Sequence, residues 1–329
     1  MMSGLYLGID TSNYKTSVAV TDSLNHVVFE RSEFLEVEKG KRGLRQSEAF
    51  FRHSQRLPEY IEELCKSLDI RSVEAIGVSS RPRRVEGSYM PCFLAGINTA
   101  REIAAVLDIP LHEFSHQEGH AAAVIEDSDT CSRDLSGSDS LMFHLSGGTT
   151  EFLLCRMDDA GYDLRIVGGT RDISIGQLID RVGVAMGYPF PSGAYLDEEV
   201  SRSSDIRTHI LPAIKIKDGY FNLSGAETKL LRAIGTAEKK DYPAYSAELF
   251  DSVAALLAAA SYRLSNEYHT DTVYMAGGVA SSAYIRSVIQ DKLQSIGKDS
   301  PAVIFGKPSL SGDNAVGIAR LARRIQNSR

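Results

Sequence analysis

The stretch LYLGIDTSNYKTSVAVTDSLNHVVFERSEF (residues 5–34) decides the fold, because it predicts three short strands rich in Val, Leu, Tyr and Thr. DTSN and DSLN supply the turns between them. Apolar residues at helical spacing over 47–68 predict a helix that is broken or kinked near Pro58. The next elements are a strand, a helix and a strand at 74–80, 92–107 and 110–115. The predicted order is β-β-β-α-β-α-β.

The second half of the chain repeats this opening. Residues 140–169, SLMFHLSGGTTEFLLCRMDDAGYDLRIVGG, again predict three strands, with Ser-Gly-Gly-Thr-Thr as the first turn. An irregular section is expected near GYFNLSGAET (219–228). Strands are expected in 271–280 and 302–305, and helices around 174–187, 194–203, 245–267 and 314–327.

The repeated order predicts two related α/β lobes with an active site between them, although sequence identity between the halves is low. Lobe I spans 1–127 and lobe II spans 128–329, and the segment 312–329 is a candidate to pack back on lobe I. Two facing lobes of this kind, each with a turn pointing into the cleft, suit a nucleotide.

Charge, cysteine spacing and the length of apolar runs limit the classes of function. The 329-residue chain is 43% hydrophobic with a formal charge of −7, which argues against wrapping nucleic acid without a partner or a local basic patch. Its four cysteines form no C-x-x-C pair, so neither a zinc knuckle nor a disulfide framework is indicated. The N-terminus does not resemble a signal peptide, and the longest apolar run (253–260) is too short for a bilayer. The expected location is the cytoplasm, with no membrane partner.

Two turns in matching positions are candidate anion sites. The first includes Asp10 and Ser12, and the second is Ser146-Gly147-Gly148-Thr149. Glycines allow close backbone approach, and successive N–H groups form a concavity that binds anions. Each turn alone is equally well an ordinary hairpin turn, but together they favour a phosphate cleft.

A Gly-Gly pair and two carboxylates are candidates for the rest of a nucleotide. Gly277 and Gly278 follow a strand and would leave room for a base, although such a pair is often only a tight turn. Asp180 and Asp197 could accept ribose hydroxyls, but a solvated helix carboxylate is the commoner case.

The stretch SHQEGH (115–120) raises the question of a metal. His116 and His120 point the same way on a helix, and a carboxylate such as Asp313 at a helix N-cap could complete a set for zinc or iron. An isolated H-x3-H pair is more often structural. A zinc-protease core is disfavoured, because Glu118 would lie about 200° around the helix from His116.

Seven motifs occur in order along the chain. They are H-x-E-G-H, S-G-G-x-T-E, G-x-x-x-D, G-Y-P, S-G-x-x-T, A-G-G-V-A and D-N-A. This set resembles the TsaD/Gcp family, tRNA threonylcarbamoyladenosine synthases once labelled O-sialoglycoprotein endopeptidases. The resemblance implies a two-lobed actin-like ATPase fold, the duplicated RNase H-like architecture shared by actin, sugar kinases and heat-shock ATPases.

The resemblance also implies a reaction and a site. The reaction transfers threonylcarbamoyl from threonylcarbamoyl-adenylate to N6 of the adenosine beside the tRNA anticodon and releases AMP. One divalent metal, iron or zinc, would be held by His116, His120 and Asp313, beside an ATP-, ADP- or AMP-type nucleotide. Asp10 and Ser12 are the candidate catalytic residues. The candidate nucleotide residues are Ser146, Gly147, Gly148, Thr149, Asp180, Gly193, Asp197, Gly277, Gly278 and Ser282.

The chain departs from the family's pattern at several positions. The family's E-T-S-C-D-E-T is D-T-S-N-Y-K-T here, and its G-P-G-L-x-x-S-L loop is RPRRVEGSYMPCF (81–93). Single changes are Glu227 for a lysine, Ser282 for an asparagine, and His144 two residues before S-G-G. The metal set survives while much of the acceptor side does not, which indicates a diverged member.

Three functions remain open from the sequence. The first is threonylcarbamoyl transfer to tRNA, reached through a complex rather than by this chain alone. The second is carbamoyl transfer to a different acceptor, suggested by the rewritten 81–93 loop. The third is a non-catalytic nucleotide-binding paralogue that partners a family enzyme, or a homodimer, through the helix over 47–68.

Overall fold

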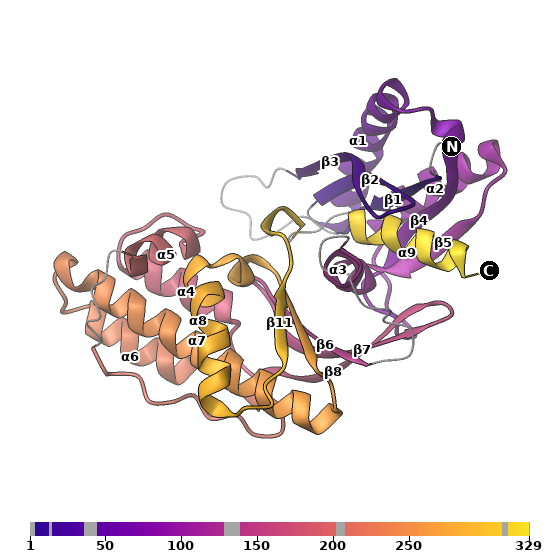
Figure 1. Cartoon of the computed structure of the whole chain (residues 1–329). Helices are drawn as coiled ribbons and strands as arrows, with labels where there is room; N and C mark the ends of the chain where they lie inside the picture. Colours follow the sequence, from indigo (N-terminus) through magenta and orange to yellow (C-terminus); the bar gives the residue numbers. More distant parts are fainter. Residues whose placement is uncertain are drawn as a thin grey trace. The chain divides into compact units, whose positions relative to one another are not determined.

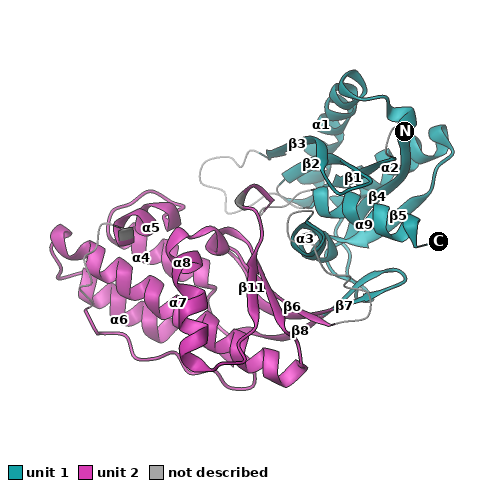
Figure 2. Ribbon diagram, viewed as in Figure 1, with its two compact units in different colours: residues 1–137, 156–164, 312–329 teal, residues 138–155, 165–311 magenta. Residues whose placement is uncertain are grey.

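The computed structural model describes two compact units (Figure 2). Unit 1 comprises Met1–Gly137, Arg156–Leu164 and Gly312–Arg329, and unit 2 comprises Ser138–Cys155 and Arg165–Ser311. The described residues are 4–12, 15–35, 45–127, 139–201, 208–310 and 315–328. The lobes 1–127 and 128–329 stay a prediction, and the compact units assign Arg156–Leu164 to the first unit.

Unit 1 contains a five-stranded sheet in the order β3-β2-β1-β4-β5 (Figure 1). β1 pairs antiparallel with β2 and parallel with β4, and β4 pairs parallel with β5. The strands are β1 (Leu5–Asp10), β2 (Lys15–Asp22), β3 (Val27–Phe34), β4 (Val73–Arg81) and β5 (Leu111–Ser115). The helices are α1 (Gln46–Ser67), α2 (Phe93–Leu107), α3 (His116–Ile125) and α9 (Val316–Asn327). The predicted β-β-β-α-β-α-β order is confirmed up to β5.

Helix α1 runs unbroken through Pro58, so the predicted break is wrong, and the alternative of a kink stays a prediction. Its buried positions, spaced three or four residues apart, form one largely apolar face that packs on α2, β2 and β3. Leu57 and Tyr60 are buried on either side of the proline. This burial offsets the one backbone hydrogen bond that the proline removes.

Helix α9 lies directly on β1 and α3, as Figure 1 shows for the yellow C-terminal helix. A Cβ atom on Gly8 of β1 would lie only 2.1 Å from the Ala315 carbonyl oxygen. A Cβ atom on Gly317 would lie 1.9 Å from the Gly119 carbonyl oxygen of α3. Ser17 of β2 accepts a hydrogen bond from the Ala315 backbone N–H at 2.9 Å. These contacts fix the start of α9 beside the helix that carries the histidines.

Unit 2 contains a six-stranded sheet in the order β11-β10-β6-β7-β8-β9. Its run β8-β7-β6-β10-β11 repeats the order of unit 1, so the predicted repeat of the opening is confirmed. The strands are β6 (Ser140–Leu145), β7 (Thr150–Asp158), β8 (Gly161–Thr170), β9 (Tyr220–Phe221), β10 (Thr272–Ala276) and β11 (Ala302–Phe305). The helices are α4 (Ile175–Ala185), α5 (Gly193–Ser201), α6 (Ser224–Ile234), α7 (Tyr242–Tyr268) and α8 (Ala283–Ile296).

The section expected to be irregular at 219–228 instead contains β9 and the first turn of α6. Asp172, distant in sequence, accepts hydrogen bonds from the backbone N–H groups of Leu223 at 2.9 Å and Ser224 at 3.0 Å. These donors lie at the N-terminus of α6, where a helix leaves its N–H groups without intrahelical partners. The carboxylate therefore supplies a cap that local sequence does not contain.

Each unit has its own hydrophobic core. In unit 1 the core includes Leu7, Ile9, Val18 and Ile76, all of them fully buried. In unit 2 it is built around α7 and the β6–β7 pair, where Phe143 and Phe152 stack with ring centroids 3.8 Å apart. None of the helices within the described residues combines the length and the apolar character that crossing a bilayer requires.

We expect Gly8→Ala to lower the free energy of unfolding by about 1–3 kcal/mol, because the new methyl group would collide with the backbone of α9. Chemical denaturation measures this. Gly225→Ala in α6 is the matched control, since a Cβ atom there meets nothing within 4 Å and alanine favours a helix. Equal stability of the two variants would contradict the assigned contact.

Asp172 predicts a pH dependence of stability. Burial raises its pKa, but the hydrogen bonds from Leu223 and Ser224 outweigh burial and lower the pKa to about 2. The unfolded value is about 3.9, so the stabilisation is present above pH 4 and is lost as the pH falls through about 2. Asp172→Asn should cost about 1 kcal/mol at pH 7, and this cost should shrink below pH 4.

Urea denaturation of both proteins at several pH values measures the effect of Asp172→Asn. The exposed Asp159, changed to asparagine, serves as the control. A cost that is the same at pH 7 and pH 3 would contradict the capping role.

Candidate functional site

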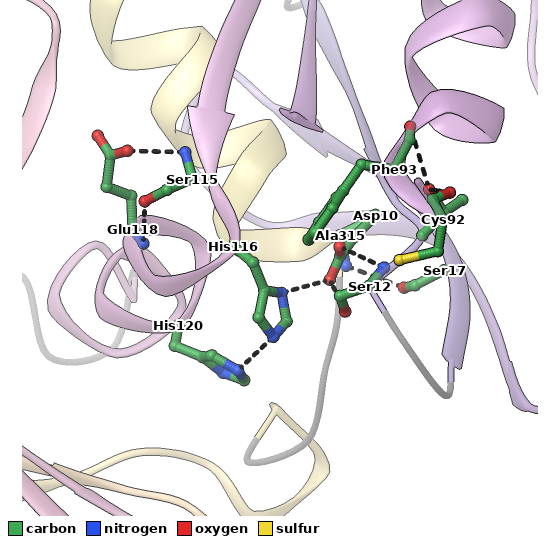
Figure 3. Close-up of polar contacts among 11 residues, drawn as sticks. Asp10, Ser12, Ser17, Cys92, Phe93, Ser115, His116, Glu118, His120 and Ala315 are labelled. Atoms are coloured by element: carbon green, nitrogen blue, oxygen red, sulfur yellow. Dashed lines mark hydrogen bonds and ion pairs between the residues drawn. The ribbon is translucent and has the colours of Figure 1, made fainter. Parts of the chain in front are cut away.

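Helix α3 presents two imidazoles on one face. Its start is fixed by a capping box, in which the Ser115 hydroxyl accepts from the Glu118 N–H and the Glu118 carboxylate accepts from the Ser115 N–H. One helical turn then separates His116 from His120. Their Nε2 atoms lie 3.0 Å apart, and the ring centroids are 4.4 Å apart (Figure 3).

Asp10, at the end of β1, orients the first imidazole. Its Oδ2 atom lies 3.0 Å from His116 Nδ1, and its side chain is 1% exposed. Ser12 holds the same carboxylate, since its N–H donates to Oδ1 at 3.1 Å and its hydroxyl donates to Oδ2 at 3.2 Å. The predicted pair Asp10 and Ser12 therefore lies together with His116 in unit 1.

This donor set fits a metal. Two nitrogens bound to one tetrahedral zinc at about 2.0–2.1 Å lie roughly 3.3 Å apart, close to the observed Nε2 separation. A carboxylate on the other ring nitrogen is the usual partner of a metal-binding histidine. Asp313 lies outside the described residues, and no group of three or more His, Cys, Asp or Glu side chains within the described part could hold a metal ion. The metal assignment stays a prediction.

Glu118 faces away from this pair, in agreement with the argument against a zinc protease (Figure 3). Besides its cap to Ser115, it accepts a hydrogen bond from the Tyr162 N–H at 3.2 Å. Burial raises the pKa of Glu118, while the hydrogen bonds from Ser115 lower it, and the net direction is upward. Its carboxylate is used to hold the start of α3.

The second predicted turn, Ser146–Thr149, joins β6 to β7 in unit 2. The Ser146 hydroxyl accepts from the Thr149 N–H at 3.0 Å, and the Ser174 hydroxyl donates to the Gly147 carbonyl at 2.8 Å. Gly147 and Gly148 are exposed, and a Cβ atom on either would meet nothing within 4 Å. Packing within the chain does not require glycine here, so these two positions leave backbone open to a ligand.

A cavity of about 390 Å³ in unit 2 collects many of the predicted nucleotide residues, and its size is within the range of ligand pockets. The predicted residues that line it are Gly147, Asp180, Gly193, Asp197, Gly278 and Ser282. The other lining residues are Gly176, Ile179, Pro191, Ala194, Phe250, Val279 and Ser281. Residues far apart in sequence thus meet at one site with both polar and apolar walls.

The two cavity aspartates differ in their partners. Asp180 accepts one hydrogen bond, from the Ser192 N–H to Oδ1 at 2.7 Å. Asp197 accepts from the Ser282 hydroxyl at 2.6 Å and from the N–H groups of Ala283 and Tyr284 at 2.7 and 3.2 Å. Asp197 therefore caps the N-terminus of α8, whereas Asp180 keeps one oxygen for the cavity.

The two glycines after β10, Gly277 and Gly278, have different structural roles. Gly277 has φ +102, and a Cβ atom on it would lie 2.3 Å from the Leu145 carbonyl oxygen, so glycine is required by the fold. Gly278 lines the cavity, and nothing lies within 4 Å of a Cβ atom built there. Of this predicted pair, only Gly278 is in contact with the cavity.

The departures from the family's pattern have local partners. Lys15 is buried, with Nζ 5.4 Å from the centre of the Phe34 ring. Glu227 accepts a hydrogen bond from Arg181 at 2.9 Å. Ser282 is the N-cap of α8, through a hydrogen bond from the Ile285 N–H at 3.1 Å. Tyr14 lies outside the described residues.

The apolar walls of the cavity were not predicted from the sequence. Phe250 belongs to the long helix α7, and its sequence context predicts only a buried core residue, although it lines the cavity. Gly176 could have been found, because it lies two residues after Ser174, the N-cap of a capping box. In the structure, a Cβ atom on Gly176 would meet the Gly147 backbone at 2.5 Å. The remaining wall residues carry no local signal.

Sequence comparison gives one family over most of the chain. The model of TsaD, described as tRNA N6-adenosine threonylcarbamoyltransferase, matches residues 29–320. A protein of that name from Thermotoga neapolitana is 27% identical over 318 residues, which cover 95% of this chain and 92% of the relative. A namesake from Streptococcus suis is 28% identical over 334 residues, covering 98% of this chain and 92% of the relative.

Three solved structures illustrate the similarity of fold. HypF from T. kodakarensis has a TM-score of 0.59 and 13% identity, covering all of this chain and 48% of HypF. Component A of the Acidaminococcus fermentans (R)-2-hydroxyglutaryl-CoA dehydratase has a TM-score of 0.56, 12% identity and full coverage of both chains. A Streptomyces griseus glucokinase in complex with glucose and AMPPNP has a TM-score of 0.51 and 12% identity, over 98% of this chain and all of the kinase. The predicted actin-like ATPase fold class is confirmed.

Because Asp180 and Asp197 have different hydrogen-bond partners, their asparagine variants should have different effects. Asp180→Asn keeps an acceptor for Ser192 but replaces the free oxygen by a donor, so we expect about tenfold weaker AMP binding and an unchanged melting temperature. Asp197→Asn should lose part of the α8 cap and destabilise the protein by about 1 kcal/mol. Calorimetric titration and thermal denaturation measure the two effects. AMP binding by Asp180→Asn at the parent's affinity would remove this residue from the site.

Proposed function

The chain belongs to the TsaD family of tRNA N6-adenosine threonylcarbamoyltransferases, and we propose that it transfers threonylcarbamoyl from threonylcarbamoyl-adenylate to N6 of the adenosine beside a tRNA anticodon. The observation that carries the proposal is the convergence of six predicted nucleotide residues on one cavity in unit 2. Family membership supports the reaction class, and the lining of the cavity supports adenylate binding there.

The cavity suits an adenosine. Ile179, Phe250 and Val279 offer apolar surface to a base, and glycines leave the backbone accessible beside them. Asp180 can accept a hydrogen bond from a ribose hydroxyl with the oxygen that Ser192 does not use. The glucokinase of similar fold was solved with AMPPNP, which supports a nucleotide in a protein of this architecture.

The turn Ser146–Thr149 is the proposed cradle for the phosphate or carbamoyl oxygens. Gly147 and Gly148 present backbone without side chains, and the turn is held by the hydroxyls of Ser146 and Ser174. Backbone N–H groups in such a turn donate to anionic oxygens without reorganising.

In the proposed reaction, the N6 amine of adenosine attacks the carbonyl carbon of the threonylcarbamoyl group. A new N–C bond forms while the C–O bond to the phosphate breaks, AMP leaves with the electron pair, and the amine loses one proton. The residues of this chain would bind the adenylate, orient its acyl group and keep water from the carbonyl carbon.

His116 and His120 would hold a divalent iron or zinc ion, with Asp313 as the proposed third ligand. When bound, the ion would supply Lewis-acid polarisation of carbamoyl and phosphate oxygens. Asp10 would act as a positioning residue, since its contact with His116 Nδ1 turns Nε2 of that ring toward His120. The net charge of −7 favours tRNA contact through a complex, with a protein partner or second copy on α1.

The test is restoration of the tRNA modification in a strain depleted of its own enzyme, measured by mass spectrometry of tRNA nucleosides. The parent should restore it, and His116→Ala/His120→Ala should not. Elemental analysis should find about one metal ion per parent chain and none in that variant. Asp10→Asn should weaken metal affinity about 10- to 100-fold in a chelator competition while the protein stays folded.

His112→Ala is the matched control, because this histidine lies in β5 outside the pair. Soluble parent protein that fails to restore the modification would contradict transfer to tRNA. Turnover of a carbamoyl-adenylate with a small amine would then select the alternative acceptor. A metal-free parent that binds AMP would leave the histidines structural and favour the non-catalytic partner.

A further inference from the structure

Residues 82–92, between β4 and α2, form a loop that is anchored at both ends beside the candidate histidines. The Gln117 N–H donates to the Pro82 carbonyl at 3.1 Å, which joins the start of the loop to α3 directly after His116. The loop ends at Phe93, whose ring centroid lies 6.4 Å from that of His116. A group bound by this loop would therefore lie close to His116.

The middle of the loop has a defined conformation. Arg84 forms a bidentate ion pair with Asp158, in which Nη1 lies 3.0 Å from Oδ1 and Nη2 lies 2.9 Å from Oδ2. The Ser88 N–H donates to the Val85 carbonyl at 3.2 Å, and the Ser88 hydroxyl accepts from the Arg83 N–H at 3.0 Å. The loop is thus a built turn rather than a loose connection.

This turn exposes apolar and aromatic surface. Val85 and Tyr89 are each 61% exposed, although the same loop holds Arg84 and Ser88 in specific contacts. Two neighbouring exposed side chains on a hydrogen-bonded turn form a small apolar surface, and grouped apolar exposure of this kind is typical of interaction sites.

The loop is also locally basic in an acidic protein. Arg81 at the end of β4 and Arg83 and Arg84 in the loop are opposed by Glu86 of the loop and by Asp158, which pairs with Arg84. One net positive charge therefore remains here, whereas the whole chain carries −7. A local cationic patch of this kind attracts a polyanion without making the whole surface basic. The combination of an exposed aromatic ring with arginines is typical of surfaces that bind unpaired nucleotides.

We propose that Tyr89 and Arg83 receive an unpaired base and its phosphate in the RNA acceptor, next to the adenosine that is modified. The inference rests on the proposed transfer to tRNA and deepens it by assigning the recognition surface. Tyr89 stacks on the base, Arg83 contacts the backbone, and the Arg84–Asp158 pair holds the loop in place.

The test uses the full chain and two fluorescent RNA probes, a hairpin with a single-stranded loop and a fully paired duplex of the same composition. Tyr89→Ala should weaken hairpin binding about 5- to 100-fold, as expected for one lost base stack, and Tyr89→Phe should retain the parent's affinity within about twofold. Arg83→Ala should reduce the salt dependence, lowering the slope of log K against log salt by about 0.7. Arg71→Ala is the control, since this arginine is 81% exposed elsewhere in unit 1.

The same variants are assayed for transfer to tRNA, with melting temperatures as a check of folding. If the parent transfers to tRNA and Tyr89→Ala binds the hairpin and transfers as well as the parent does, this inference is wrong while the proposed function stands. Hairpin binding through Tyr89 without any transfer would overturn the proposed function and leave the loop as an RNA site. Absence of hairpin binding by the parent would overturn the inference. Self-association that Tyr89→Ala abolishes would also overturn it and would assign the loop to a second copy.

Discussion

The candidate histidine site depends on a contact between backbones, where α9 crosses β1 and α3. Glycine is required at Gly8 and Gly317, because a Cβ atom on either would collide with a carbonyl oxygen of the opposing element. Gly119, between the two histidines, supplies the carbonyl that Gly317 meets. Small residues on both helices bring the end of the chain against the helix that carries His116 and His120.

Polar contacts then hold this arrangement from the interior. Arg320 of α9 is 1% exposed and donates to the Ala123 carbonyl of α3 at 2.7 Å, with Asp127 at 3.6 Å. A buried guanidinium is costly without such partners, so α9 cannot shift along α3 without leaving that charge unsatisfied. Close packing and the buried arginine therefore fix the same helix pair, and Asp10 orients His116 within it.

The sequence predicted features that repeat or depend on local spacing. The three-strand openings, their repeated order and the direction of His116 and His120 all follow from period and turn chemistry. It could not predict partners that are distant along the chain. The α6 cap by Asp172, the bond from Asp10 to His116 and the engagement of Asp197 by α8 each join residues between about fifty and a hundred positions apart.

The departures from the family's pattern occur in both units, but their structural consequences differ. In unit 2 the changed residue Ser282 lines the cavity and is also the N-cap of α8, so it has a structural role in the cavity wall. The rewritten loop of unit 1 instead gains the Arg84–Asp158 pair and an exposed Tyr89. A binding cavity tolerates only changes that preserve its backbone, whereas a surface loop can acquire a new acceptor chemistry without disturbing the core. This asymmetry is what a transferase would show if its donor were retained while its acceptor surface was reshaped.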